Sequence, residues 1–211
     1  MNQRKVWNAI AESWYNFRQR PFSDFEKITE RIKLSSRAKI LDVGCGNCRH
    51  LLPFHDYDLY GLDFSEEMLR YARKFCEKHN IDVKLVLGDC KTLPFHDNVF
   101  DLVLCIAVLH HLSNPLLALM EIHRVLKSGG ILIVSVWNKW QPRFLWNIIT
   151  GKKEIFVPWR KGDKIYYRYY RLISKQELDL MLRMTGFRNI NIFYGTKKGL
   201  FYQNIFATAK K

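Results

Sequence analysis

The stretch KILDVGCGN, residues 39–47, decides the fold because a run typical of a buried strand leads directly into a glycine turn. Gly44 and Gly46 allow the backbone to turn sharply and to approach a ligand closely, and a helix that starts after such a turn presents free N–H groups. A glycine loop alone is weak evidence, so the neighbouring segments have to support a ligand site.

Strand-like and helical segments alternate along the rest of the chain. After KILDV (39–43), four β-rich runs follow: DLYGLD (58–63), VKLVL (83–87), FDLVLCI (100–106) and ILIVSVW (131–137). This alternation predicts a mainly parallel sheet. Two later runs, FRNINIF (187–193) and LFYQNIFATA (200–209), are joined by a short loop and predict an antiparallel pair. We expect an α/β, Rossmann-like fold whose seven-stranded sheet is mainly parallel and ends in an antiparallel C-terminal hairpin.

Capping residues mark three of the helices. Ser65, followed by two glutamates, predicts a helix through Cys76. Asn114 before a proline predicts the next helix, and Ser174 opens a capping box.

The chain also begins with a predicted amphipathic helix. Four apolar residues recur there at helical spacing: Val6, Ile10, Trp14 and Phe17. Pro21 ends this segment, and a second helix is expected over residues 24–33.

The net charge is +14, and it is unevenly distributed. Residues 1–37 hold 8 basic and 4 acidic side chains, residues 38–135 hold 10 and 12, and residues 136–211 hold 16 and 4. A solvated charged surface explains such an excess as readily as a ligand does. Because the excess lies outside the middle of the chain, it also favours a polyanionic partner, with nucleic acid first.

Composition indicates the cellular compartment. The longest apolar run is far shorter than a membrane helix needs, and no segment near the first residue resembles a secretion signal. Five cysteines without a framework spacing are typical of a reducing compartment. We expect a cytoplasmic protein.

Two acidic residues extend the glycine-loop argument. Asp42 ends the first strand, and Asp63 ends the second strand, 17 residues beyond Gly46. A carboxylate at the second position can accept hydrogen bonds from a ribose diol. Dinucleotide sites and S-adenosylmethionine sites share this arrangement.

The pattern Asp-x-Gly-x-Gly, without the helix start GxGxxG, resembles class I S-adenosylmethionine-dependent methyltransferases. Three further matches follow in order: GDC (88–90), FD (100–101), and VLKSGG (125–130), which has Ser128 where proline is usual. The resemblance implies S-adenosylmethionine as the cofactor. It places the cofactor at Asp42, Gly44, Cys45, Gly46, Asp63, Met68, Asp89, Cys90 and Ile106.

Cys48 departs from the family pattern because many members carry a third glycine there, so we expect its side chain to narrow the methionine end of the pocket. Cys45 and Cys48 also spell C-x-x-C, but no second pair at ligand spacing accompanies them, so we assign no metal site. One of His110 and His111, which follow the fourth strand, should face the reacting carbon, and a buried structural role is favoured for the other.

A more specific resemblance covers nearly the whole chain. The segments AESWYNFRQ (11–19), IAVLHHLS (106–113), VSVWN (134–138), VPWR (157–160) and YYRYYRL (166–172) resemble the tRNA wobble-uridine methyltransferases that esterify 5-carboxymethyluridine. In that family, the N-terminal helix and the insertion after the fifth strand close over the crevice and meet the RNA. The resemblance implies catalytic roles for Arg18, Tyr15 and His111. It implies RNA contacts for Trp14, Trp137, Lys152, Lys153, Arg160 and Lys161.

The same resemblance implies partners and an organisation. The partners are a tRNA anticodon loop and a small zinc-binding activator protein that pairs along strand 83–87, with no membrane involved. We expect one methyltransferase domain over residues 1–211. Its parts are an N-terminal helical cap (1–37), a donor-binding core (38–137), a basic insertion (138–165) and a C-terminal helix with strands (166–211).

Two alternatives remain at this point. A small-molecule methyltransferase, for example of a quinone ring, would share the core and need no basic flanks. A non-catalytic RNA-binding protein on the same fold would keep the flanks and could lose the donor site. The basic C-terminal part argues against the small-molecule methyltransferase. Asp42, Asp63 and Asp89 together argue against the non-catalytic RNA-binding protein.

Overall fold

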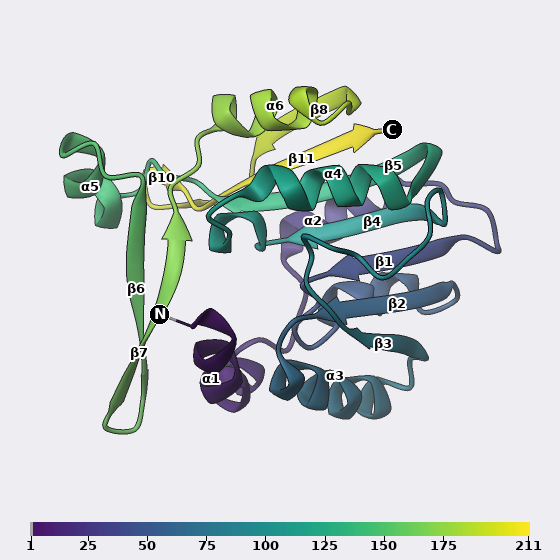
Figure 1. Ribbon diagram of the computed structural model, residues 1–211, viewed down its shortest axis with the longest axis horizontal. Coiled ribbons are helices and arrows are strands. Elements are labelled where there is room, and N and C mark those ends of the chain that lie inside the picture. Colours follow the sequence, from purple (N-terminus) through teal and green to yellow (C-terminus); the bar gives the residue numbers. More distant parts are fainter. Residues whose placement is uncertain (1) are drawn as a thin grey trace.

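The computed structural model describes residues 2–211, apart from the side chain of Lys198. Seven strands form one sheet in the order β3-β2-β1-β4-β5-β11-β8 (Figure 1). The strands are β1 (Lys39–Val43), β2 (Asp58–Asp63), β3 (Val83–Leu87), β4 (Phe100–Ile106), β5 (Leu126–Trp137), β8 (Arg188–Tyr194) and β11 (Asn204–Lys210). The first five are parallel, and β11 is antiparallel to both β5 and β8. The predicted fold is confirmed.

Helices cover both faces of the sheet and create two apolar layers. One layer joins the sheet to α2 (Ser23–Thr29), the 3-10 helix η1 (Arg49–Phe54) and α3 (Glu66–His79). The other layer joins it to α4 (Pro115–Val125) and α6 (Lys175–Met184). Because both faces are covered, the central strands are apolar on both sides, as strand β4 shows with six of its seven residues buried.

The predicted caps are confirmed. The side chain of Ser65 accepts a hydrogen bond from the Met68 N–H, and Asn114 caps α4 in the same way. Ser174 and Glu177 form a reciprocal capping box. The helix opened by Ser65 runs one turn further than expected and ends where Asn80 adopts a left-handed conformation.

The N-terminal helix α1 (Gln3–Phe17) differs from its predicted apolar stripe. Val6 and Ile10 are buried, whereas Phe17 is 73% exposed. The stripe ends early because α1 packs between α3 and a hairpin rather than lying along the sheet (Figure 1), so in its last turn Tyr15 packs against Tyr71 of α3 while Phe17 faces solvent. The second helix is also shorter than expected, because α2 ends at Thr29.

Most residues of the basic insertion (138–165) are in regular structure. They contain η3 (Pro142–Phe144), α5 (Leu145–Ile149) and the strand β6 (Glu154–Lys161), which pairs with β7 (Lys164–Arg171). The hairpin therefore crosses the expected boundary at residue 165. The sequence did not reveal this hairpin because β6 alternates only between exposed and half-buried positions. A strand without a buried face lacks the strict alternation of apolar and polar residues that identifies strands. Another short hairpin comprises β9 (Lys197–Lys198) and β10 (Phe201–Tyr202).

The β6–β7 hairpin stands beside α1, as Figure 1 shows, and polar side chains join the two. The Trp159 Nε1–H donates to Ser13 Oγ (2.9 Å), and the Lys161 ammonium donates to the Ala9 carbonyl (3.1 Å) and pairs with Glu12 (3.2 Å). The hairpin and α1 thus form one wall over the carboxyl ends of the strands.

Strand β3 forms one edge of the sheet, as the resemblance implied. In the part of the chain that the structure describes, no helix combines the length and the apolar character that crossing a membrane requires.

Candidate active site

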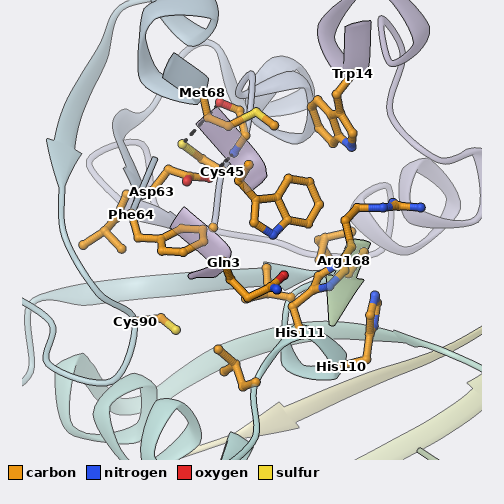
Figure 2. Close-up of a pocket in the computed structure, with 18 of the residues that line it drawn as sticks. Gln3, Trp14, Cys45, Asp63, Phe64, Met68, Cys90, His110, His111 and Arg168 are labelled. Carbon is orange, nitrogen blue, oxygen red and sulfur yellow. Dashed lines mark hydrogen bonds between the residues drawn. The ribbon is translucent and has the colours of Figure 1, made fainter. Parts of the chain in front are cut away.

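A cavity of about 290 Å³ lies at the carboxyl ends of β1, β2 and β4. Its walls come from α1, the glycine turn, the loops after β2, β3 and β4, and strand β7. Figure 2 shows Cys45, Asp63 and Met68 on one side of the cavity and His110, His111 and Arg168 on the other. Ligands of open α/β sheets bind at this edge, so the cavity is the candidate site.

The glycine turn is shaped by its neighbours. Gly44 and Gly46 have φ values of +69° and +56°, which favour glycine. A Cβ atom at Gly46 would lie 2.8 Å from the ring of Trp14, and one at Gly44 would lie 2.5 Å from the side chain of Val108. Glycine at these two positions lets Val108 and Trp14 pack directly against the turn.

Asp63 links the glycine turn to the end of β2. Its Oδ2 accepts the N–H of Gly46 and its Oδ1 accepts the N–H of Ser65, each at 2.9 Å. Burial raises the pKa of Asp63 to about 6, and the backbone hydrogen bonds oppose this rise. Each carboxylate oxygen keeps a lone pair that can accept a ligand hydroxyl.

Asp42 lies beneath the cavity rather than in its wall. It is only 1% exposed, and its Oδ2 has no hydrogen-bond partner. Burial raises the pKa of Asp42 to about 8, against the lowering effect of the neighbouring Arg49. The other expected cofactor residues all line the cavity: Gly44, Cys45, Gly46, Asp63, Met68, Asp89, Cys90 and Ile106.

Cys48 does not narrow the cavity, contrary to the sequence-based expectation. The residue has a φ of +64° and is fully buried, and it is not part of the cavity wall. Its sulfur faces Gly61 of β2 instead, 3.0 Å from the position a Cβ atom would take there. The missing side chain at Gly61 makes the space for this thiol.

Three arginines reach the cavity, and sequence reasoning selected only Arg18. Sequence reasoning missed the other two, Arg49 and Arg168. These residues are only 3% and 7% exposed, and the Nε of each has no hydrogen-bond partner. Burial lowers the pKa of all three guanidinium groups, and that of Arg49 falls to about 9. Across residues 2–211, none of the three forms an ion pair with a carboxylate.

Two signals in the sequence could have found these arginines. Arg49 directly follows the glycine loop, so a short helix there must start next to the ligand. Arg168 and Tyr170 are two residues apart in YYRYYRL, and a strand places such a pair on one face.

The histidines after β4 are neutral hydrogen-bonding groups. The Nδ1 of His111 lies 2.9 Å from the Tyr169 carbonyl, so this nitrogen carries the proton and donates it. The Nδ1 of His110 accepts a hydrogen bond from the backbone N–H of Trp137 (3.2 Å). The Nε2–H of His110 is therefore a donor without a partner. Burial lowers the pKa of both rings, that of His111 to about 3.

The expected aromatic residues are placed differently from one another. Trp14 lines the cavity over the glycine turn. Trp137 also lines it, but its ring stacks on Tyr170 (4.4 Å between centroids) and has the Arg143 guanidinium over it. Tyr15 is outside the cavity wall and packs against Tyr71 of α3.

The expected basic residues of the insertion lie outside the cavity. Lys152, Lys153 and Arg160 are exposed, whereas Lys161 is half-buried by its contacts with α1. The structure thus brings Arg18 and His111 together at the cavity and leaves Tyr15 and these four residues elsewhere.

Comparison with known proteins identifies the fold and the family. A family model described as a methyltransferase domain matches residues 41–134. The demethylmenaquinone methyltransferase of Staphylococcus saprophyticus is 37% identical over 182 residues, which cover 79% of this chain and 77% of that protein. The chain belongs to the class I S-adenosylmethionine-dependent methyltransferases.

Two further proteins resemble this methyltransferase over most of its length. The tRNA (carboxymethyluridine(34)-5-O)-methyltransferase of Schizosaccharomyces pombe is 27% identical over 206 residues, covering 86% of each chain. A putative methyltransferase solved in complex with the Haloferax volcanii Trm112 methyltransferase activator has a TM-score of 0.72 at 18% identity, covering 99% of this chain and 97% of that chain. The second likeness concerns the fold.

S-adenosylmethionine is the methyl donor of this methyltransferase family, and the cavity fits it. The glycine turn presents backbone without side chains to the cavity, and Asp63 offers free lone pairs at the end of β2. The apolar side chains of Met68 and Ile106 complete that side of the cavity.

Proposed function

We propose that this methyltransferase esterifies the carboxylate of 5-carboxymethyluridine at the wobble position of tRNA. The observation that carries the proposal is the set of three cavity arginines without carboxylate partners. Two acidic side chains line the cavity, but Asp63 is bonded to backbone N–H groups and Asp89 pairs with Lys91 (3.4 Å). Arg49 and Arg168 are buried and Arg18 is half-buried, and cations withdrawn from water in this way favour anionic ligands.

The donor end of the cavity has the groups that its ligand requires. Asp63 would accept the ribose hydroxyls, the segment with Asp89 and Cys90 would face the adenine, and Met68 and Ile106 would contact apolar parts of the donor. When bound, S-adenosylmethionine supplies an electrophilic methyl group on a sulfonium sulfur. Arg18 and His111 line the remaining space, where the acceptor would be positioned.

A carboxylate acceptor agrees with the low pKa of His111, which makes this histidine a weak base. A carboxylate of pKa near 4 is already ionised at neutral pH, so its oxygen can attack the methyl carbon as the carbon–sulfur bond breaks, and no proton has to be removed. The neutral His111 would then shape the site and not abstract a proton. The task of the protein is to align the reactants and exclude water.

The basic surface outside the cavity supports an RNA acceptor. Lys152, Lys153 and Arg160 are exposed on the segment that forms the wall with α1. The same segment exposes Trp140 (50%) and Trp146 (75%), whose rings offer stacking faces for unpaired bases. This role suits them better than Trp137, whose ring is already stacked.

A second protein would pair along β3. This strand is an edge strand, with unpaired backbone groups on its outer side and Leu87 48% exposed. The structurally similar methyltransferase in complex with the Trm112 activator makes a small activator protein the partner to test.

A quinone-type acceptor is the second candidate, because the Staphylococcus saprophyticus relative is the more similar in sequence. A quinone ring carries no carboxylate, so it would leave Arg18 and Arg168 without an anion. Its nucleophile would also need deprotonation, and the methylation rate would rise with pH through that pKa.

The product distinguishes the two candidates. We expect labelled methyl to be transferred to tRNA that carries 5-carboxymethyluridine, to be released by mild alkali, and to form at a single-turnover rate nearly flat from about pH 6.5 to 9. Nucleoside mass spectrometry before and after alkali treatment measures this, with 5-carbamoylmethyluridine RNA as the control acceptor. An alkali-stable methyl group on either RNA would end the ester proposal.

A further inference from the structure

We propose that the cavity arginines serve two different anions: Arg49 binds the carboxylate of the methyl donor, and Arg168 binds the carboxylate of the acceptor. The Arg49 assignment, the donor half of the proposal, requires only that the chain is an S-adenosylmethionine-dependent methyltransferase. The Arg168 assignment, the acceptor half, rests on the proposed function. Arg18 also lines the cavity, and its charge lowers the pKa of both other guanidinium groups.

Arg49 is fixed at the donor end. It follows the glycine turn directly, its Nη1 donates to Asn47 Oδ1 (3.3 Å), and its guanidinium lies over the rings of Trp14 (4.8 Å) and Phe22 (5.4 Å). The same Trp14 ring covers Gly46. A buried guanidinium held over two rings, with a free Nε, is preorganised for a carboxylate.

Arg168 is fixed at the opposite end. Its Nη1 donates to the Tyr170 hydroxyl (3.0 Å), and its guanidinium lies over the ring of Trp159 (4.8 Å). Figure 2 shows Arg168 beside His110 and His111, across the cavity from Asp63. The unpartnered Nε of Arg168 and the free Nε2–H of His110 are therefore donors at the acceptor end.

The charges argue for two anions rather than one. Burying Arg49 and Arg168 and half-burying Arg18 without ion pairs costs free energy, and the charge of Arg18 lowers the pKa of the other two guanidinium groups. One donor carboxylate beside Arg49 cannot also reach the opposite wall, because the donor's nucleoside must remain at Asp63. A second carboxylate beside Arg168 satisfies that end, and it stands where a methyl acceptor has to be.

The donor half is tested by binding alone. Calorimetry compares S-adenosylhomocysteine with 5′-methylthioadenosine, which has the same nucleoside thioether but no amino acid. We expect Arg49→Gln to raise the Kd of S-adenosylhomocysteine roughly tenfold or more and to leave that of 5′-methylthioadenosine within about twofold. Arg168→Gln and the control Arg171→Gln should change neither. Equal weakening of both ligands by Arg49→Gln, or of neither, overturns this half.

The acceptor half is tested with two anticodon stem-loop RNAs that differ only at the wobble base, one with a carboxymethyl group and one with the uncharged carbamoylmethyl group. We expect the wild-type protein to bind the carboxylate RNA roughly tenfold more tightly. Arg168→Gln should bring this ratio close to one, and Arg168→Lys should restore part of it. Arg171→Gln, on the same strand, should keep the wild-type ratio.

The outcomes separate this inference from the proposed function. No preference for the carboxylate in the wild-type protein would contradict the proposed function and the acceptor half together. If the preference for the carboxylate RNA survives in Arg168→Gln, or if Arg18→Gln abolishes it while Arg168→Gln does not, the acceptor half is overturned. The proposed ester reaction would then still stand.

Discussion

The carboxylate of Asp63 has both a structural role and a proposed binding role. It holds the glycine turn through Gly46 and the helix start through Ser65, and it faces the cavity where the donor ribose should bind. Burial raises its pKa to about 6, above the usual value of 3.8. The ionised form therefore costs folding free energy as pH rises from about 4 to about 6, and a proton competes with the ribose hydroxyls below pH 6.

Donor affinity should consequently depend on pH. We expect the Kd of S-adenosylhomocysteine to rise as pH falls from 7 to 5, approaching about tenfold per unit below pH 6. Asp42 does not titrate in this window, because burial raises its pKa to about 8. Calorimetry on wild type and Asp63→Asn checks this: the variant should bind more weakly at pH 7 and show no pH dependence. A wild-type Kd that is constant from pH 7 to 5 contradicts the assignment of Asp63.

Gly61 illustrates a residue whose role depends on side chains distant in sequence. A Cβ atom there would lie 3.0 Å from the sulfur of Cys48 and 3.1 Å from that of Cys45. We expect Gly61→Ala to lower the free energy of unfolding by about 1 kcal/mol, because overpacking exceeds the gain from replacing a strand glycine. Urea denaturation measures this. The double variant with Cys48→Ala should recover part of the loss, and strict additivity would argue against the contact.

At the scale of elements, the β6–β7 hairpin and α1 act as a pair. Arg168 reaches the cavity from β7, and Arg18 follows the end of α1, so neither element alone completes the acceptor end. The contacts of Trp159 and Lys161 with α1 hold them together. The outer side of this wall carries the exposed basic residues.

RNA affinity should therefore depend on salt through this wall. We expect the variant Lys152→Ala, Lys153→Ala, Arg160→Ala to reduce the slope of log K against log salt by about 2, because fewer counterions are released. Lys161 is left intact because it already pairs with Glu12. Fluorescence anisotropy with an anticodon stem-loop measures the slope. As a matched control, alanine at the exposed residues Arg73, Lys74 and Lys78 of α3 should leave it unchanged; equal slopes for wild type and the first variant would exclude the hairpin side as the RNA surface.

At the scale of the molecule, three regions bear on the proposed function. The cavity lies at the carboxyl edge of the sheet, the basic wall covers one side of it, and the free edge β3 lies at the end of the sheet away from β8 (Figure 1). An activator paired with β3 would be separated by that strand alone from β2, whose end carries Asp63.

The edge can be tested with two similar leucines. We expect Leu87→Lys to weaken the complex with a small zinc-binding activator protein by at least roughly tenfold, because a charge would face the apolar side of the added strand. Leu117→Lys on α4 is the matched control, since Leu87 is 48% and Leu117 43% exposed. Size-exclusion chromatography and calorimetry of the co-expressed proteins measure the complex. Equal effects of the two substitutions would place the partner elsewhere.

The sequence determined the sheet, the helix caps and the donor loop. These features are local: KILDVGCGN carries its own strand and turn, and Ser65, Asn114 and Ser174 satisfy backbone groups within their own helices. Period and capping depend on residues close in the chain, so one sequence reveals them. The same reasoning found the C-terminal antiparallel pair from its short connection.

Only the tertiary structure decided which side chains share the cavity. Arg49, Arg168 and His110 come from three segments, and Tyr15 and Phe17 of the segment AESWYNFRQ (11–19) face away from the cavity. Cys48 likewise points at Gly61 because β2 runs beneath the loop. The physical reason is that burial and missing partners, which turn an arginine into an anion site, depend on packing between distant segments, and no local pattern records them.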